Sequence, residues 1–186
     1  MLESAAVTEA RKRIRLAEEN YLGWRACFIT LCCHDRLPFF RDAGRATALI
    51  NHLRGLSAQM AFWVHAYCVM PDHVHILVEG QRAECNLVRF VQKLKMVSAF
   101  AERKRSGRQL WQRSFYDHIV RPRESHESIA WYIWMNPVRK GYVAEPERYP
   151  FSGSLTCEWK QSPKPAFPWT PPWHASAGKQ SKSGSM

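Results

Sequence analysis

Two histidines separated by one residue, His73 and His75, are the side chains whose spacing most directly indicates chemistry. They stand in an alternating stretch, residues 70–78 (MPDHVHILV), which predicts a β-strand from position 73 onward. Side chains at i and i+2 of a strand share a face, so the two imidazoles should lie side by side while Val74 faces the core. Two neutral imidazoles on a rigid strand supply two of the ligands that a metal ion needs.

A second group of candidate residues lies on a helix that the pattern predicts over residues 125–138. Tyr132 and Asn136 are four residues apart there, so their side chains lie one turn above each other on one helix face. Pro137 marks the end of this helix or a kink in it, and Gly141 suits a left-handed turn just beyond. A tyrosine taken alone is more often a packing residue than a nucleophile, so its role depends on its neighbours.

Taken together, the imidazoles of His73 and His75 and the amide of Asn136 would form a site with two nitrogen ligands, one oxygen ligand and open positions. Such mixed ligation suits Mg²⁺ or Mn²⁺ held near a phosphate better than a closed zinc site. Tyr132 would then place a hydroxyl beside the bound phosphate. A phenol has a reference pKa of about 10, so it needs nearby positive charge to act as a nucleophile at pH 7.

The composition is typical of a globular protein with a polyanionic partner. The 186 residues are 46% hydrophobic and 12% aromatic, enough for one domain with a core. Lys and Arg number 27 against 16 acidic residues, so the net charge is +11, and nucleic acid is the commonest partner of so basic a protein. A basic surface without a specific partner is the alternative. We see no secretory signal and no run of about 18 apolar residues, so we expect a cytoplasmic protein without a membrane partner.

The order of the predicted elements indicates an α+β fold. Four strands and three helices are expected, with the strands over residues 24–33, 61–69, 73–78 and 110–120 and the helices over residues 42–59, 86–103 and 125–138. Apart from the last helix, this order is that of the ferredoxin-like βαββαβ core, a four-stranded antiparallel sheet with two helices on one face. The last helix, which carries Tyr132, is an addition at the C-terminal side of that core.

The chain divides into a basic helical lead-in (1–23), a folded domain (24–154) and a tail rich in Pro, Trp and Ser (155–186). The tail is expected to be flexible or to follow the surface. On the helix over residues 86–103, the side that runs from Leu87 to Ala101 should pack on the sheet, and a basic stripe lies opposite. The candidate DNA-contacting residues are basic side chains of the lead-in, of this stripe and of the loop after the fourth strand: Arg11, Lys12, Arg13, Arg15, Arg89, Lys93, Arg103, Lys104, Arg121 and Arg123.

Several of these motifs resemble one known family. The triplet His73-Val74-His75 matches the His-hydrophobic-His element of the HUH single-strand endonucleases. Residues 111–118 (WQRSFYDH) and 132–141 (YIWMNPVRKG) resemble the REP-associated tyrosine transposases, bacterial relatives of the single-tyrosine insertion-sequence transposases. Residues 149–154 (YPFSGS) resemble the segment that follows in that group. The resemblance runs from about residue 24 to residue 154 in the family's order.

The resemblance implies a ferredoxin-like nuclease core with Tyr132 as nucleophile and His73 and His75 as metal ligands. Asn136 matches the position of the family's third ligand, where some relatives have Gln. The implied activity is metal-dependent cleavage and rejoining of single-stranded DNA at palindromic repeats that fold into hairpins, through a 5′-phosphotyrosine, with Mg²⁺ or Mn²⁺ as cofactor. The protein would be bacterial, cytoplasmic and nucleoid-associated, and either a monomer or a homodimer. Residues 117–118 match a family element for which we expect structural hydrogen bonding.

Three other functions are compatible with parts of the sequence. A non-catalytic nucleic-acid-binding module with the same fold would stack bases on exposed aromatic side chains. A relaxase or replication initiator would share the core chemistry, but such proteins normally need additional domains. A zinc hydrolase would also use His73 and His75, and it is disfavoured because Asp72 is the only acidic side chain nearby that could act as a general base.

Overall fold

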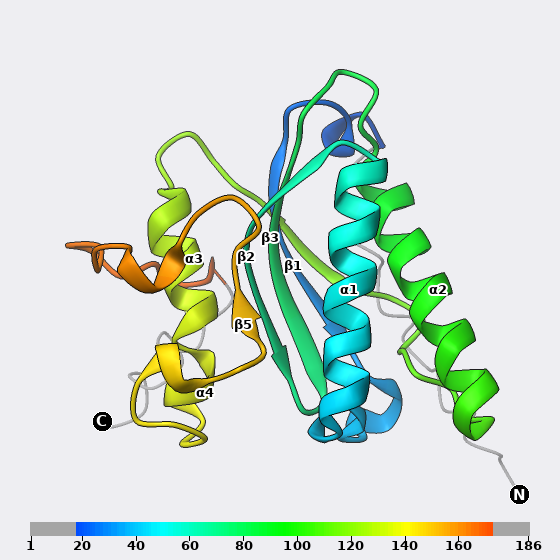
Figure 1. Ribbon diagram of the computed structural model, residues 1–186. Helices are drawn as coiled ribbons and strands as arrows, with labels where there is room; N and C mark the ends of the chain where they lie inside the picture. Colours follow the sequence, from blue (N-terminus) through cyan, green and yellow to red (C-terminus); the bar gives the residue numbers. More distant parts are fainter. Residues whose placement is uncertain (1–17, 173–186) are drawn as a thin grey trace, which may run out of the picture.

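The computed structural model describes residues 18–172, and a five-stranded antiparallel sheet lies at its centre. Helices α1 and α2 lie side by side on one face of the sheet, and α3 and α4 lie on the other (Figure 1). The strands are Ala26–Cys32 (β1), Phe62–Met70 (β2), His73–Gly80 (β3), Tyr116–Ile119 (β4) and Ser152–Gly153 (β5). The α-helices are Ala43–Gln59 (α1), Leu87–Ser106 (α2), His126–Trp134 (α3) and Asn136–Arg139 (α4). Short 3₁₀ helices span Glu18–Tyr21, His34–Arg36, Phe39–Arg41, Pro146–Arg148 and Trp159–Gln161.

The sheet order β4-β1-β3-β2-β5 contains the predicted ferredoxin-like core and one further strand. The added strand, β5, pairs with Tyr67 and Cys68 of β2 and is too short for a sequence pattern to reveal. Its Gly153 is required there, because a Cβ atom at that position would overlap the Tyr67 ring. The fourth strand is shorter than predicted: β4 begins at Tyr116, and the chain before it contributes only an isolated bridge from Trp111.

Side chains of successive strand residues point to opposite sides of the sheet, and both sides are apolar. On one face, Val78 of β3 packs in the same cluster as Phe90 of α2. On the other face, Leu77 of β3 packs with Ile129 of α3. Because His73 and His75 alternate in phase with Leu77, they lie on the face that α3 covers.

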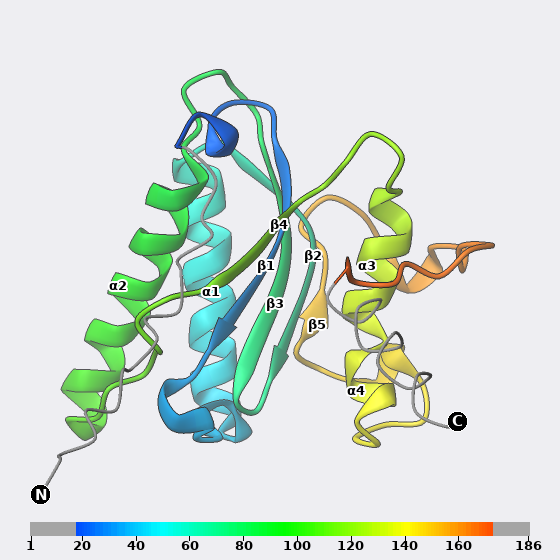
Figure 2. The same ribbon diagram turned by 180° about the vertical axis from the view of Figure 1, so that it is seen from behind.

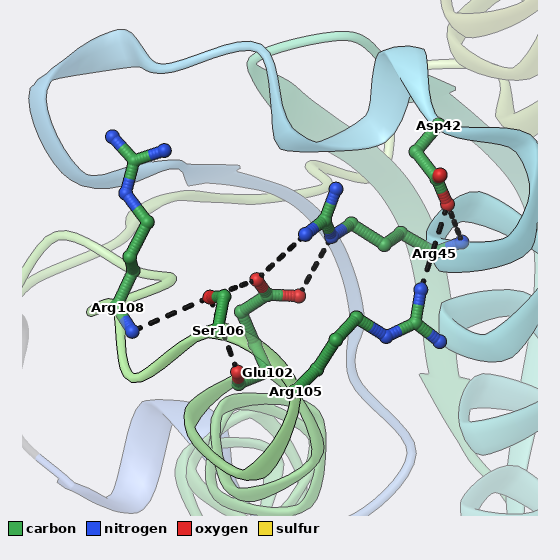
Figure 3. A network of polar contacts seen from close by, with 6 residues as sticks. All are labelled: Asp42, Arg45, Glu102, Arg105, Ser106 and Arg108. Atoms are coloured by element: carbon green, nitrogen blue, oxygen red, sulfur yellow. Dashed lines mark hydrogen bonds and ion pairs between the residues drawn. The ribbon is translucent and has the colours of Figure 1, made fainter.

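A buried ion pair joins α2 to α1. The Glu102 side chain is 4% exposed and accepts hydrogen bonds from Arg45 Nε at 2.8 Å and from Arg45 Nη2 at 3.1 Å (Figure 3). Ser106 Oγ donates a further hydrogen bond to Glu102 Oε1 at 2.5 Å. The sequence prediction that Ala101 packs inward is wrong: Ala101 is exposed and Glu102 turns inward, because Arg45 satisfies its carboxylate on both oxygens.

Replacing Arg45 by methionine should lower the free energy of unfolding at pH 7 by about 3 kcal/mol, because it leaves a buried carboxylate without its cation. Burial raises the pKa of Glu102, but hydrogen bonds from Arg45 and Ser106 outweigh this and hold the pKa below its ordinary value. In the wild-type protein this carboxylate therefore stabilises the fold above its ordinary pKa, and that stabilisation is lost as the pH falls through the lowered value. Without Arg45 the pKa of Glu102 should rise. Protonation of this buried carboxylate at low pH should then reduce the destabilisation of the variant.

The destabilisation of Arg45→Met should consequently be larger at pH 7 than at about pH 4, as measured by urea denaturation. Arg105→Met is the matched control, because Arg105 is half-exposed and lies 3.6 Å from the exposed carboxylate of Asp42 (Figure 3). This control should change the free energy of unfolding by less than about 0.5 kcal/mol. Equal losses in the two variants, or a loss independent of pH, would contradict the role given to the buried pair.

Between β5 and residue 172 the chain follows the surface of the domain, and residues 173–186 of the predicted tail lie outside the described residues. Within it, Trp159 is buried and Trp169 packs on Phe28 and Tyr132. Of the predicted lead-in only residues 18–23 are described, and Arg11, Lys12, Arg13 and Arg15 lie outside the described residues. Across residues 18–172, no helix has the length and apolar character needed to cross a membrane.

Candidate active site

His73 and His75 stand side by side at the start of β3. Their Nε2 atoms are 3.1 Å apart, and both residues are buried. Each Nδ1 atom has a separate partner: Asp72 Oδ1 lies 2.6 Å from that of His73, and Thr30 Oγ1 lies 2.9 Å from that of His75. The structure thus brings the two imidazoles together as their i, i+2 spacing predicts, and it adds a polar partner behind each ring.

The partners on Nδ1 direct both Nε2 atoms toward one point. Metal-binding histidines characteristically hold the second ring nitrogen in a hydrogen bond to a carboxylate or another polar group, which fixes the tautomer and the ring orientation. Asp72 Oδ1 accepts a hydrogen bond from the Nδ1–H group of His73. In that tautomer the lone pair of the ring is on Nε2, where a cation would bind. Burial lowers the pKa of His73 and, more strongly, that of His75, which keeps both rings in the neutral form that binds metal. The pair therefore fits a divalent cation.

Tyr132 approaches this pair from α3. Its ring centre lies 6.5 Å from that of His75 and 6.0 Å from that of Phe28, and Phe28 stacks on His75 at 5.3 Å. The helix lies on the face of the sheet opposite α1 and α2 and contacts both β2 and β3 (Figure 2). The candidate nucleophile and the two candidate ligands, which are far apart in the sequence, therefore occupy one site.

Arg139 supplies positive charge beside the phenol. Its Cζ lies 4.1 Å from the centre of the Tyr132 ring, and its Nη2 donates a hydrogen bond to the Tyr132 carbonyl oxygen at 2.7 Å. Burial raises the pKa of Tyr132, and the charge of Arg139 acts in the opposite direction. Sequence reasoning requires such a charge but does not identify Arg139, although residues seven apart share a helix face.

Asn136 is buried and begins α4, with one residue, Met135, between it and the end of α3. The helix predicted over 125–138 forms with an interruption at Met135, between α3 and α4, in agreement with the end or kink that Pro137 indicates. Pro137 explains the interruption: it has no N–H group to donate, and its ring clashes with the carbonyl group four residues earlier in a regular helix. Asn136 still follows Tyr132 by about one turn on the same side of the sheet. Its role as a third metal ligand stays a prediction.

Asp117 and His118 have the structural contacts expected of them. Tyr21 donates a hydrogen bond from its hydroxyl to Asp117 Oδ2 at 2.6 Å. His118 Nε2 lies 2.8 Å from a Glu124 oxygen, and the other oxygen of Glu124 accepts a hydrogen bond from Trp169 Nε1 at 3.0 Å. These contacts fix β4 and hold Trp169, whose ring meets that of Tyr132 edge-on at 5.1 Å.

An open cleft of about 490 Å³ adjoins His73 and carries three basic side chains, Arg36, Arg41 and Lys140; we call it the basic cleft. Arg36 also pairs with Asp72 at 3.3 Å. The sequence analysis misses these three residues, because they come from two short 3₁₀ helices and the end of α4, which meet only in the folded chain. The cleft gives the site a positively charged border next to a candidate metal ligand.

The predicted DNA-contacting residues of the described chain lie elsewhere. Residues 121 and 123 are exposed in the loop before α3, at the end of that helix remote from Asn136. The basic stripe is exposed on α2, on the opposite side of the sheet from α3 (Figure 1). The structure brings neither group next to the histidine pair, and their DNA contacts stay predictions. These residues are Arg121 and Arg123 in the loop, and Arg89, Lys93, Arg103 and Lys104 in the stripe.

Comparison with known proteins relates this chain to one family of transposases. The family model for IS200-like transposases matches residues 26–136. A Haemophilus influenzae protein assigned to the REP-associated tyrosine transposases is 28% identical in an alignment of 140 residues that covers 67% of this chain and 77% of that protein. The REP-associated tyrosine transposase of Escherichia coli K12 is 26% identical over 92 residues, 49% of this chain and 53% of that protein. A solved structure of a REP-associated tyrosine transposase bound to a REP hairpin shares the fold, with a TM-score of 0.61 at 22% identity over 71% of this chain and 78% of that chain.

The matched region extends from the first residue of β1 to Asn136. It therefore includes both histidines of β3 and Tyr132, the residues on which the resemblance to this family was based. The resemblance is confirmed. This chain belongs to the IS200-like transposase family, and its relatives there are REP-associated tyrosine transposases.

Proposed function

We propose that this transposase cleaves and rejoins single-stranded DNA at palindromic hairpin repeats, with Tyr132 as the nucleophile. The observation that carries the proposal is the convergence of the Tyr132 ring, from α3, on the paired Nε2 atoms of His73 and His75, from β3. The relative that was solved with a REP hairpin supports the choice of hairpin DNA as the partner. The excess of basic residues supports a polyanionic substrate.

We propose Mg²⁺ or Mn²⁺ as the cofactor, held by His73 and His75 with the Asn136 amide oxygen as third ligand. The buried pair of Nε2 atoms, each ring fixed from behind, leaves coordination positions open for phosphate oxygens. When bound, the cation would offset negative charge on the scissile phosphate. The protein residues orient the site and keep the imidazoles neutral.

In the proposed step, the Tyr132 hydroxyl oxygen attacks phosphorus and gives up its proton to water. The bond between phosphorus and the 3′ oxygen breaks, and the departing oxygen takes up a proton to become a free 3′-hydroxyl. The strand on the 3′ side of the break stays joined to the tyrosine through its 5′ phosphate, as a phosphodiester. Arg139, over the ring, stabilises negative charge that develops on the phenol oxygen. One phosphodiester replaces another, so a 3′-hydroxyl can reverse the step without an energy source.

The proposal is tested by incubating the protein with hairpin repeats from the host genome in Mn²⁺ or Mg²⁺. Each single strand is labelled at either its 3′ or its 5′ end. We expect a denaturant-resistant adduct that carries the 3′ label and lacks the 5′ label, because the tyrosine retains the strand on the 3′ side of the break. A non-catalytic DNA-binding module would bind the hairpin and form no adduct. Absence of the adduct with every repeat and both ions would reject the proposal.

The basic cleft provides a path for the strand next to His73. The double variant Arg41→Gln/Lys140→Gln should weaken binding of single-stranded DNA and reduce the slope of log Kd against log salt by about 1.4, or about 0.7 for each lost phosphate contact. The matched control is Arg54→Gln, since Arg54 is exposed on α1, across the sheet from the site. An unchanged slope in the double variant would remove the cleft from the DNA path.

A further inference from the structure

Three side chains that bind metals in other proteins come together near the end of β3, away from the active site. They are Glu79 of β3, His65 of β2 and His126, the first residue of α3. His65 Nε2 lies 2.8 Å from Glu79 Oε2, and His126 Nδ1 lies 4.0 Å from the same oxygen. One possible ligand atom from each of the three lies within 4.8 Å of the others.

We propose that His65, Glu79 and His126 form a second metal site, for Zn²⁺ or a transition-metal ion of similar preference. Two imidazole nitrogens and one carboxylate oxygen are an established zinc ligand set, with water in the fourth position. In a tetrahedral site with bonds of about 2.0–2.1 Å, the ligand atoms are about 3.3 Å apart. Two of the three separations, 2.8 and 4.0 Å, lie on either side of that distance and all three are within 4.8 Å, so modest side-chain movements would complete the site.

A β-bulge in β2 gives His65 its place in this cluster. Val64 pairs with Val78 and Ala66 pairs with Leu77, so His65 is the extra residue between two regular pairs. Val64 belongs to the core under α1 and α2, whereas Ala66 belongs to the core under α3. The bulge therefore lets two consecutive residues, His65 and Ala66, turn toward α3, where Glu79 and His126 are found.

The surroundings of the cluster suit a bound ion. Thr156 Oγ1 lies 3.4 Å from His65 Nδ1, which leaves Nε2 as the nitrogen directed at Glu79. The rings of His65 and His126 stack with their centres 5.4 Å apart. The side chains of His65 and Glu79 are 23% and 21% exposed, so they are held by packing and still open to an ion. A cavity of about 280 Å³ beside both histidines gives room for a water ligand or for the Cys157 thiol.

This second site is separate from the active site and does not depend on the proposed function. Glu79 follows His75 by four positions along β3, a distance of about 13 Å along the strand, so one ion cannot serve both. The two sites share α3, however, because His126 begins the helix that carries Tyr132. An ion at the second site would join the first turn of that helix to β2 and β3.

The site is tested by metal titration of tag-free protein that has first been stripped with a chelator. The variant His73→Ala/His75→Ala removes the active-site pair, and we expect it to bind one equivalent of Co²⁺, with the intense visible absorption of a tetrahedral complex, and to release it to Zn²⁺. Adding His65→Gln/His126→Gln should weaken this binding by at least about 100-fold. If His52→Gln, a substitution on α1, is added instead, Co²⁺ binding should be unchanged.

Two further measurements keep the test decisive. Zn²⁺ should raise the melting temperature of His73→Ala/His75→Ala by a few degrees, and this rise should vanish when Glu79→Gln is added. If the variant without the active-site pair does not fold, the comparison is made in the wild-type background, where two equivalents should fall to one in His65→Gln/His126→Gln. Failure to bind Co²⁺ without the active-site pair, or binding that survives loss of His65 and His126, would overturn the proposal. Neither result depends on DNA cleavage.

Discussion

Replacing Tyr132 by phenylalanine should abolish the covalent DNA adduct and lower the rate of hairpin cleavage by at least about 10⁴-fold. The change removes one oxygen atom, the atom that attacks phosphorus in the proposed step. The ring that remains keeps its contacts with His75, Phe28 and Trp169. The fold, the histidine pair and the binding of the hairpin should therefore be preserved while the chemical step is lost. Single-turnover cleavage of hairpin DNA labelled at its 3′ end measures this directly.

Tyr67→Phe is the matched control, because it removes the same atom from a buried tyrosine of β2 that packs in the core under α1 and α2. Cleavage by this variant should stay within about threefold of the wild type, and its adduct should form normally. An adduct that persists in Tyr132→Phe would assign the nucleophile to another residue. Hairpin binding that disappears together with cleavage would show that the hydroxyl acts in recognition and not in the chemical step.

The part of the site that the sequence predicts correctly is the part that local geometry determines. His73 and His75 share a strand face because residues i and i+2 always do, whatever the rest of the fold. Tyr132 is different: no periodicity connects residue 132 with residue 75. The approach of their ring centres to 6.5 Å follows from the ferredoxin-like topology together with the added helix, which the order of the predicted elements indicated.

The residues that the sequence analysis misses depend on long-range pairing. Thr30 reaches His75 because β1 and β3 pair in the register that sets these two residues opposite each other. A shift of one residue would turn Thr30 to the other face, and nothing in either segment alone fixes that register. The inward position of Glu102 has the same origin, since it requires Arg45 from another helix. A prediction from hydrophobic periodicity assigns a charged residue to the exposed face of a helix unless its ion-pair partner is known.

At other positions the local signals are present but allow more than one outcome. Pro137 is compatible with the end of a helix or with a kink, and the structure selects an interruption that starts a new short helix at Asn136. The proline-rich segment after residue 155 is compatible with a flexible chain. It is equally compatible with a segment that follows the surface, and in its described part Trp159 is buried and Trp169 packs on Tyr132, contacts that a composition-based reading does not count.

Removing both imidazoles, in His73→Ala/His75→Ala, should lower cleavage in Mg²⁺ or Mn²⁺ by at least about 10³-fold, because the cation loses its nitrogen ligands. Asp72→Asn and Thr30→Val should have smaller effects, since these residues only orient the rings through Nδ1. Each should raise the Mn²⁺ concentration needed for half-maximal cleavage by about 10–100-fold. The rate measured as a function of Mn²⁺ concentration separates the two classes of variant.

This graded response distinguishes a metal site from a buried histidine pair that serves only packing. If the cation is held by the Nε2 atoms, a high Mn²⁺ concentration should restore cleavage in Asp72→Asn and Thr30→Val and fail to restore it in His73→Ala/His75→Ala. His52→Gln, on α1, should show the wild-type dependence on Mn²⁺. If the pair only packs, the orienting variants would lose stability and activity together, and no amount of Mn²⁺ would recover either. Wild-type Mn²⁺ dependence in Thr30→Val would contradict the geometry on which the metal assignment depends, because Thr30 is the group that aims His75 at the ion.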